Sequence, residues 1–190
     1  MKHIVLASAS PRRQEYLALL GYPYTCKVAD VDESSIQKTE PACLAMATAR
    51  LKARAVAAEE RDAIIIGADT VVSVEGTILG KPRDAADAQR MLALLSGRAH
   101  QVYTGLCLID TESGREICDY RETTVWMQPI SREEIEAYVA TQEPMDKAGA
   151  YAIQGGASRF VEAIEGCYFN VLGLPINLLY NLLTSINLNL

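Results

Sequence analysis

The chain has few of the residues that build zinc or serine hydrolase sites. It contains two histidines, His3 and His100, far apart in the sequence, and no Cys-x-x-Cys pair. Zinc sites combine closely spaced Cys and His ligands, and α/β serine hydrolases carry a Gly-x-Ser-x-Gly turn, which is also missing. These absences argue strongly against both classes of hydrolase.

Two common nucleotide-binding motifs are missing as well. No Gly-x-Gly-x-x-Gly segment follows an apolar run, so a dinucleotide-binding fold has no support. The nearest approach to a Walker loop is Gly76 to Lys81, and there Pro82 stands where a Walker loop has Ser or Thr. Any nucleotide chemistry must therefore rest on other residues.

The chain also lacks a basic excess and a long apolar run. Its 18 Lys and Arg stand against 24 Asp and Glu, a net charge of -6, which disfavours nucleic acid and anionic lipid as partners. The leucine-rich stretch from Val171 is interrupted by Pro175 and several asparagines, whereas a membrane span needs about 20 mostly apolar residues. The apolar run Ile4 to Ala7 is too short for a signal peptide.

Cysteine is present in an odd number without a recognisable pairing. A disulfide scaffold is not expected, and we interpret the thiols as small buried core residues in a reducing compartment, which predicts a cytoplasmic protein. The five residues are Cys26, Cys43, Cys107, Cys118 and Cys167.

What is present is enough apolar surface for a core. The 190 residues are 49% apolar and 22% charged, which excludes a disordered chain and predicts one domain over residues 1–190, or two intimately packed lobes. Local patterns predict short strands alternating with helices that begin at Ser10-Pro11, Pro41, Asp84 and the Ser131/Glu134 capping box. Strands are expected at 3–7, 24–28, 63–66, 71–74, 77–79, 101–110, 116–127 and 160–164, and a last helix at 170–183, kinked or started at Pro175. The fold class is α/β with a central mixed sheet.

A first candidate site lies where the first helix begins. Ser8 and Ser10 supply hydroxyls, and the backbone N–H groups of a helix N-terminus attract anions. Arg12 and Arg13 place two positive charges at the positive end of the helix dipole. This arrangement is unfavourable, so the two arginines need an anion nearby. Phosphate binding is one interpretation, and a capped helix with solvated arginines is the other.

Two further candidates follow the central apolar strand. Asp69 is expected at the strand end, where a carboxylate can hold a metal or activate water, and a turn-forming Asp is the alternative. Lys81 follows Gly80 in the loop after the hairpin, where it can meet a phosphate oxygen. Lys81 alone is a weak signal.

The remaining candidates are isolated polar residues. Glu33, in an acidic run, and Lys52, on the alanine-rich helix, would add a metal ligand and a cation, although solvated surface residues would look identical. The Gly- and Ala-rich segment from Asp146 to Gly155 suits a backbone held against a ligand, with the Gln154 amide facing a base edge. A simple Gly/Ala turn is the alternative.

Taken together, these segments resemble the Maf family of nucleoside triphosphate pyrophosphatases. The resemblance covers nearly the whole chain, and its last motif resembles the branch that acts on dTTP and UTP. The segments are Ser8-Ala-Ser-Pro-Arg-Arg13, Gly67-Ala-Asp-Thr-Val-Val72, Leu79-Gly-Lys-Pro82, Ser96-Gly-Arg-Ala-His100 with Tyr103-Thr-Gly105, and Asp146-Lys-Ala-Gly-Ala-Tyr-Ala-Ile-Gln-Gly155.

The resemblance implies hydrolysis of the bond between the α and β phosphates, a divalent cation (Mg²⁺ or Mn²⁺), and a cleft between two lobes of an α/β fold. It implies Asp69 as proton acceptor and metal ligand, with Glu33 as a second carboxylate. It further implies that Arg12, Thr70 and Gln154 select the base and that Arg13, Lys52 and Lys81 contact phosphate. Ser8 joins the substrate-binding residues because of its place at the helix N-terminus.

Four points stay open. The family pattern has Gly where this chain has Ala152, and if that position required a positive φ, alanine would cost about 1 kcal/mol and shift Gln154. If the chain belonged to the other branch of the family, its substrate would be 7-methyl-GTP. If it bound nucleotides without turnover, it would be a nucleotide-sensing regulator of cell division. The C-terminal helix would pack either in the core or against a second copy, and the second arrangement would give a homodimer.

Overall fold

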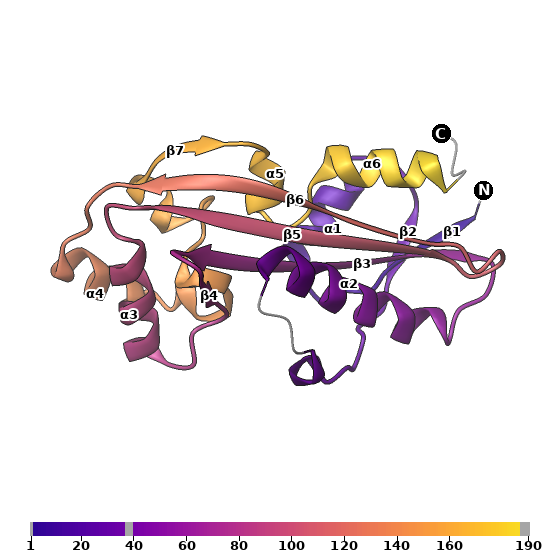
Figure 1. Ribbon diagram of the computed structural model, residues 1–190, viewed down its shortest axis with the longest axis horizontal. Helices are drawn as coiled ribbons and strands as arrows, with labels where there is room; N and C mark the ends of the chain where they lie inside the picture. Colours follow the sequence, from indigo (N-terminus) through magenta and orange to yellow (C-terminus); the bar gives the residue numbers. More distant parts are fainter. Residues whose placement is uncertain (1, 37–39, 187–190) are drawn as a thin grey trace.

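A computed structural model describes residues 2–36 and 40–186. It contains a seven-stranded sheet in the order β2-β1-β3-β5-β6-β7, and β4 pairs with β3 outside this path (Figure 1). The first three strands run parallel, and β3, β5, β6 and β7 run antiparallel, so the sheet is mixed, as predicted. The strands are β1 His3–Leu6, β2 Tyr24–Cys26, β3 Ala63–Val74, β4 Thr77–Leu79, β5 Ala99–Asp110, β6 Glu116–Met127 and β7 Val161–Glu165.

Helices flank the sheet, and the first four begin where the sequence predicts. The last predicted helix, 170–183, is instead two helices: a short one at Tyr168–Val171 and a longer one that starts after Pro175, at Ile176. Ser10 caps α1, Asp84 caps α3, and Ser131 with Glu134 forms the capping box of α4. These starts are predictable because the capping side chain bonds a backbone N–H only three residues away. The helices are α1 Pro11–Ala18, α2 Pro41–Ala57, α3 Ala85–Leu95, α4 Arg132–Ala140, α5 Tyr168–Val171 and α6 Ile176–Ser185, with 3₁₀ turns at Glu33–Ser35, Glu143–Asp146, Ala148–Ala150 and Gly156–Phe160.

Strand β3 is longer than predicted, and this moves Asp69. The strand runs unbroken past Gly67 to Val74, so Asp69 lies within the sheet opposite Gly105 of β5, and the predicted strand end before it is wrong. A turn-forming Asp is also excluded. The glycine does not end the strand. It leaves room for α2, because a Cβ on Gly67 would lie 2.1 Å from the carbonyl oxygen of Ala49.

The other edge of β3 has a gap that exposes the predicted site. β1 pairs with β3 as far as Ile66, and β4 pairs with it from Val72 onward. Within the described residues, no strand pairs with this edge from Gly67 to Val71. Asp69 and Thr70 lie in this gap.

The core is divided into three apolar clusters. One lies under α1 and α6, a second packs against α3 and α4, and a third lies under α2 (Figure 1). On β3, Ile66 and Ala68 belong to the first cluster and Val72 to the second, and alternation puts all three on one side of the strand with Thr70 between them. The two clusters form two lobes that meet at Thr70.

The last helix packs within the chain. The leucines of α6 are buried in the first cluster, which decides between the two predicted placements in favour of the core. They are Leu178, Leu179, Leu182 and Leu183. None of the helices in the described ranges is long and apolar enough to span a membrane.

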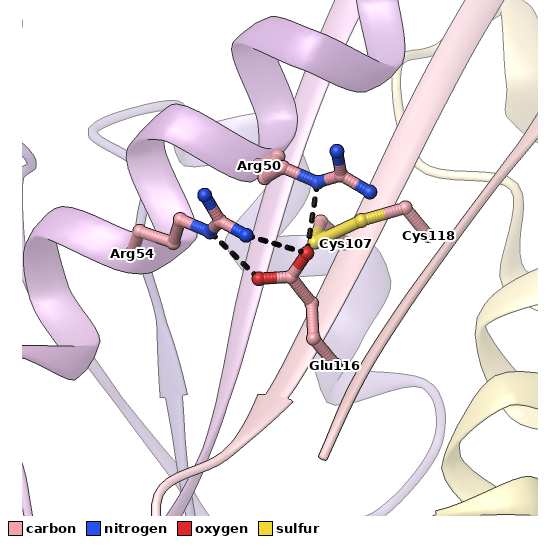
Figure 2. Close-up of a disulfide and its surroundings, with 5 residues drawn as sticks. All are labelled: Arg50, Arg54, Cys107, Glu116 and Cys118. Atoms are coloured by element: carbon pink, nitrogen blue, oxygen red, sulfur yellow. Dashed lines mark hydrogen bonds and ion pairs between the residues drawn. A yellow bond between two sulfur atoms is a disulfide. The ribbon is translucent and has the colours of Figure 1, made fainter. Parts of the chain in front are cut away.

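The cysteine prediction is wrong for most of the five residues. Cys107 and Cys118 face each other across the β5–β6 pair, with Cα atoms 4.1 Å apart, and form a disulfide (Figure 2). Cys26 and Cys43 are exposed, and Cys167 is half-buried. The spacing could not reveal the pair, because only the register of the hairpin sets the two residues opposite each other.

Ion pairs beside the disulfide fasten α2 to β6. Figure 2 shows Glu116 between Arg50 and Arg54, which come from successive turns of α2. The Nε atoms of Arg50 and Arg54 lie 2.8 Å and 2.7 Å from the two carboxylate oxygens. These ion pairs hold α2 against the sheet at one residue before Lys52 in the sequence and at one residue after it.

Candidate functional site

A cavity of about 700 Å³ opens between the two lobes, beside the gap in the edge of β3. Its walls come from the loop after β1 with the first turn of α1, from β3 itself, and from the segment between α4 and β7. Every residue that the sequence analysis selected lines this cavity: Ser8, Arg12, Arg13, Glu33, Lys52, Asp69, Thr70, Lys81 and Gln154.

Lys52 joins the two predicted carboxylates. Its Nζ lies 2.8 Å from Oδ1 of Asp69 and 2.9 Å from Oε1 of Glu33. The side chains of Lys52 and Asp69 are only 15% and 17% exposed, so solvent screens their interaction little. Oδ2 of Asp69 has no hydrogen-bond partner in the part of the chain described, and it remains available as an acceptor.

Arg13 is held in place by three different segments. Its Nε donates to the carbonyl of Gly173 at 2.8 Å, one terminal nitrogen donates to Thr70 Oγ1 at 3.1 Å, and the other to Ser8 Oγ at 3.4 Å. Burial lowers the pKa of Arg13 and the nearby Asp69 carboxylate opposes the shift, but a guanidinium stays charged. The cation is therefore oriented before any ligand binds.

A buried network that sequence reasoning missed supports Thr70. Its hydroxyl lies 3.0 Å from that of Thr104, which donates to the carbonyl oxygen of Asn170 at 2.9 Å. Asn170 is fully buried and its amide also bonds Thr104, Val102 and Thr123. No pattern in the sequence marks this asparagine, because its partners lie between 47 and 68 residues away.

The opposite wall carries Lys81 and one cation that was not predicted. Lys81 is exposed at the cavity, and the Gly80 carbonyl before it accepts from the N–H of Gly149 at 3.1 Å. Lys147 also lines the cavity, is 15% exposed, and pairs with the exposed carboxylate of Asp146. Lys147 belongs to the Asp146 to Gly155 segment, which the sequence pointed to as a ligand-binding segment. From that segment only the amide of Gln154 was predicted to bind.

Gln154 reaches the cavity from the same segment. Its Oε1 accepts a hydrogen bond from the hydroxyl of Tyr16 on α1. Ala152 does not have a positive φ, so the strain considered for it is not present. Within the segment from Asp146 to Gly155, the residues with a positive φ are Gly149, with φ 71°, and Ala150, with φ 58°.

The family described as Maf-like protein matches residues 3–186. The chain belongs to the Maf family.

Relatives in the Maf family share about half of the sequence. The "dTTP/UTP pyrophosphatase" of Moorella thermoacetica is 52% identical over 93% of this chain and 91% of that protein. The protein of the same name from Symbiobacterium thermophilum is 48% identical over 97% of this chain and 94% of its own. The Staphylococcus aureus Ham1 protein has a similar fold, with a TM-score of 0.54 and 16% identity over 97% and 99% of the two chains.

The Maf cavity contains donors that fit a hard divalent cation. Mg²⁺ prefers oxygen ligands and is commonly held by one or two carboxylates together with substrate phosphates. Glu33 and Asp69 supply such carboxylates, and both contact the Nζ of Lys52, so their oxygens lie close together. The only group of three His, Cys, Asp or Glu ligand atoms that meets within the described ranges is Cys107, Glu116 and Cys118, which is outside the cavity.

Proposed function

We propose that this Maf protein hydrolyses dTTP and UTP to the nucleoside monophosphate and pyrophosphate. One observation carries the proposal: a carboxylate with a free oxygen, Asp69, lies in a cavity whose other charged side chains are mainly cations. Two relatives that cover nearly the whole chain bear the name of this activity.

The cations account for the binding of the phosphate tail. A nucleoside triphosphate brings about four negative charges, which must be balanced before a nucleophile can approach phosphorus. Five lysines and arginines line the cavity against four carboxylates, so they supply part of that balance and a bound divalent cation would supply more. The cations are Arg12, Arg13, Lys52, Lys81 and Lys147, and the carboxylates are Glu33, Asp69, Glu143 and Asp146. Ser8 adds a hydroxyl beside Arg13.

Asp69 is proposed to activate the water. Lys52 occupies Oδ1, so Oδ2 accepts the proton while the water oxygen forms a bond to phosphorus. The bond from phosphorus to the bridging oxygen between the α and β phosphates breaks, and pyrophosphate leaves. Lys52 keeps the carboxylate oriented.

A divalent cation, Mg²⁺ or Mn²⁺, is part of the proposal. Glu33 and Asp69 would hold it together with phosphate oxygens, and when bound it would neutralise phosphate charge. Arg12, Thr70 and Gln154 are proposed to set the base preference. The hydroxyl of Thr70 already serves Arg13 and Thr104, so Thr70 would act through the position of Arg13.

A cytoplasmic location belongs to the same proposal, since the reaction consumes nucleoside triphosphates. No nucleic acid or membrane is needed as a partner. A homodimer stays a prediction, and the buried face of α6 gives it no support.

Substitution of Asp69 tests the reaction. Asp69→Asn keeps the shape of the side chain but removes the proton acceptor, so turnover of UTP should fall about 10²-fold or more. Pyrophosphate release is measured over dTTP, UTP, CTP, GTP and 7-methyl-GTP with Mg²⁺ or Mn²⁺. The matched control is Asp119→Asn, which changes an exposed carboxylate of β6 outside the cavity.

Each outcome of this panel has a meaning. Near-normal pyrophosphate release by Asp69→Asn would reject Asp69 as the base. Preference for 7-methyl-GTP would reject the pyrimidine substrate. Calorimetric binding of nucleotides by the wild type, without hydrolysis in Mn²⁺, would favour a regulator instead of an enzyme.

A further inference from the structure

The Cys107–Cys118 disulfide lies outside the cavity, and the proposed reaction does not use it. In a reducing compartment disulfides are usually transient, and they serve catalysis or redox sensing. The cytoplasmic location proposed above therefore makes a permanent cross-link between β5 and β6 unusual. The surroundings of the two sulfur atoms indicate how the bond is made and broken.

The two cysteines differ in their access to solvent. Cys107 has no exposed surface and packs under α2 with Ala49 and Ala53 in the third cluster. Cys118 is half-buried and packs against the same cluster. Thiol–disulfide exchange begins with the attack of a thiolate on one sulfur atom, and access decides which sulfur is attacked. Cys118 is therefore the member of the pair that a thiol from solvent can reach.

Two cations of α2 lie near the pair. A carboxylate oxygen of Glu116 lies within 4.8 Å of both sulfur atoms, and this carboxylate binds Arg50 and Arg54 (Figure 2). The side chains of the two arginines are 49% and 62% exposed, so both guanidiniums remain open to solvent. Two cations against one carboxylate leave an excess of positive charge in this group, which attracts an anionic partner.

We propose that Cys118 is a covalent exchange site for acidic low-molecular-weight thiols, with Cys107 as the buried partner that displaces them. Arg50 and Arg54 attract the carboxylates of the small thiol while its sulfur reaches Cys118. The site is separate from the cavity, so the inference goes beyond the proposed function and does not require nucleotide hydrolysis.

Oxidation of the pair uses a small disulfide of the same class of thiol. The Cys118 thiolate attacks one sulfur of that disulfide, forms a mixed disulfide and releases the first small thiolate. The Cys107 thiolate then attacks Sγ of Cys118, forms the bond between the two strands and releases the second. Two electrons pass from the protein thiols to the small disulfide, and the two thiol protons pass through solvent to the released thiolates. The reverse sequence reduces the pair and starts at Cys118.

The test uses a chain that keeps only the pair, because Cys26, Cys43 and Cys167 are replaced by serine. These three thiols are free, and none of them lines the cavity. The reduced pair-only chain is treated with glutathione disulfide and followed by intact-mass spectrometry. We expect it to lose two hydrogen atoms and to retain no glutathione at the end of the reaction.

Single substitutions in the pair-only chain separate the roles of the two sulfur atoms. Cys107→Ser should stop the reaction with one glutathione bound, since no thiol is left to displace it. Cys118→Ser should take up glutathione about tenfold more slowly, because Cys107 is buried. A thermal melt of each variant checks that it is folded under the conditions of the reaction.

The arginines are tested separately. In the pair-only chain, Arg50→Gln combined with Arg54→Gln should slow the reaction with glutathione disulfide several-fold and leave the reaction with uncharged 2-hydroxyethyl disulfide unchanged, because only the first probe is anionic. The matched control is Arg132→Gln, which changes an exposed arginine of α4 that also pairs with a glutamate. The control should alter neither rate.

Three results would contradict the inference. A pair-only chain that keeps both thiols in glutathione disulfide would overturn the exchange site. Equal uptake of glutathione by Cys107→Ser and Cys118→Ser would overturn the order of attack. Equal slowing of both probes by the arginine substitutions would overturn the preference for acidic thiols.

A measurement without substitutions at the pair guards against loss of stability in the single variants. Acid quenching of the pair-only chain early in the reaction traps the mixed disulfide, and peptide mapping should find glutathione on Cys118. Glutathione on Cys107 would overturn the proposal. Pyrophosphate release is not measured in any of these experiments, so failure of the exchange site and failure of the proposed function are distinguishable.

Discussion

At the scale of single residues, the site depends on side chains that never touch the cavity. Asn170 is the clearest example, because its buried amide has a partner at each end and its carbonyl holds Thr104. Thr104 in turn holds Thr70, and Thr70 accepts from Arg13. The direction of a guanidinium in the site is thus set by an asparagine on another element, and little reorganisation is needed when phosphate binds.

His100 is a buried histidine that links stability to pH. It is fully buried, its Nε2 lies 2.8 Å from the Tyr151 hydroxyl, and its Nδ1 has no partner in the described part of the chain. Burial lowers the pKa of His100 to about 4, whereas an unfolded chain keeps the ordinary value near 6.5. Between these values the unfolded state binds more protons, so stability must fall as the pH drops from about 6.5 to 4.

Urea unfolding at pH 7 and pH 4.5 measures this effect. We expect the titration of His100 to remove about 2 kcal/mol of unfolding free energy between these pH values. His100→Gln can still meet Tyr151 but does not titrate, so its loss over the same interval should be smaller by that amount. Equal losses in the two proteins would contradict the assignment.

At the scale of elements, the position of α2 decides the position of Lys52. Ala45, Ala49 and Ala53 are fully buried on this helix and face two glycines of the sheet. A Cβ on Gly105 would lie 2.5 Å from the backbone of Ala45, and one on Gly67 would be closer still to Ala49. The alanine-rich composition seen in the sequence is therefore explained by close approach of helix and sheet, which brings Lys52 within reach of Asp69.

Gly67→Ala tests this packing. The added methyl group meets backbone, so the helix must shift, and overpacking of this kind costs about 1–3 kcal/mol. The thermal midpoint should fall by several degrees, and UTP turnover should fall with it because Lys52 moves away from Asp69. Gly80→Ala is the control for stability, since nothing lies within 4 Å of its added Cβ. A Gly67→Ala protein that melts with the wild type would show that the close approach is wrong.

Element boundaries were predictable where local bonds set them. The starts of α1, α3 and α4 follow from caps that act over three residues. Strand β6 follows from alternation, and its partner β5 follows from a run of apolar and small residues. The extent of β3 was missed, because Gly67 usually ends a strand and only the helix packed above it explains the exception. The residue range 37–39 and the termini, which the predicted domain includes, lie outside the described residues.

At the scale of the whole molecule, the net charge is negative, but the side chains that line the cavity include more cations than carboxylates. The protein carries a net charge of -6, yet the cavity is lined by five lysines and arginines against four carboxylates. A local cationic field with low-dielectric walls attracts an anionic ligand even when the total charge is negative. The acidic surface and the cationic cavity together would favour a small anion over a polyanion that must lie along the surface.

Ionic strength tests this distribution. Raising KCl from 50 to 500 mM shortens the screening length from about 14 Å to about 4 Å. The KM for UTP should rise several-fold, while kcat changes less than twofold, since charges in contact are screened far less than those at a distance. The assay is run with the divalent cation at saturation in both buffers. A KM that does not respond to salt would contradict a cationic cavity that acts at long range.

The mixed α/β class, most helix starts and most of the nine candidate site residues were accessible from the sequence because they rest on short-range patterns or on motifs. Glu33 and Lys52 lie outside those motifs and were selected through the family resemblance. The partners of the site residues were not accessible in this way. Lys52 bonds Asp69 across 17 positions, Cys107 bonds Cys118 across 11, Tyr16 bonds Gln154 across 138, and Arg13 bonds Gly173 across 160. Such contacts depend on strand register and on the packing of α1 and α2 against the sheet. Free energy summed over the whole core selects that packing, and no single segment contains the information.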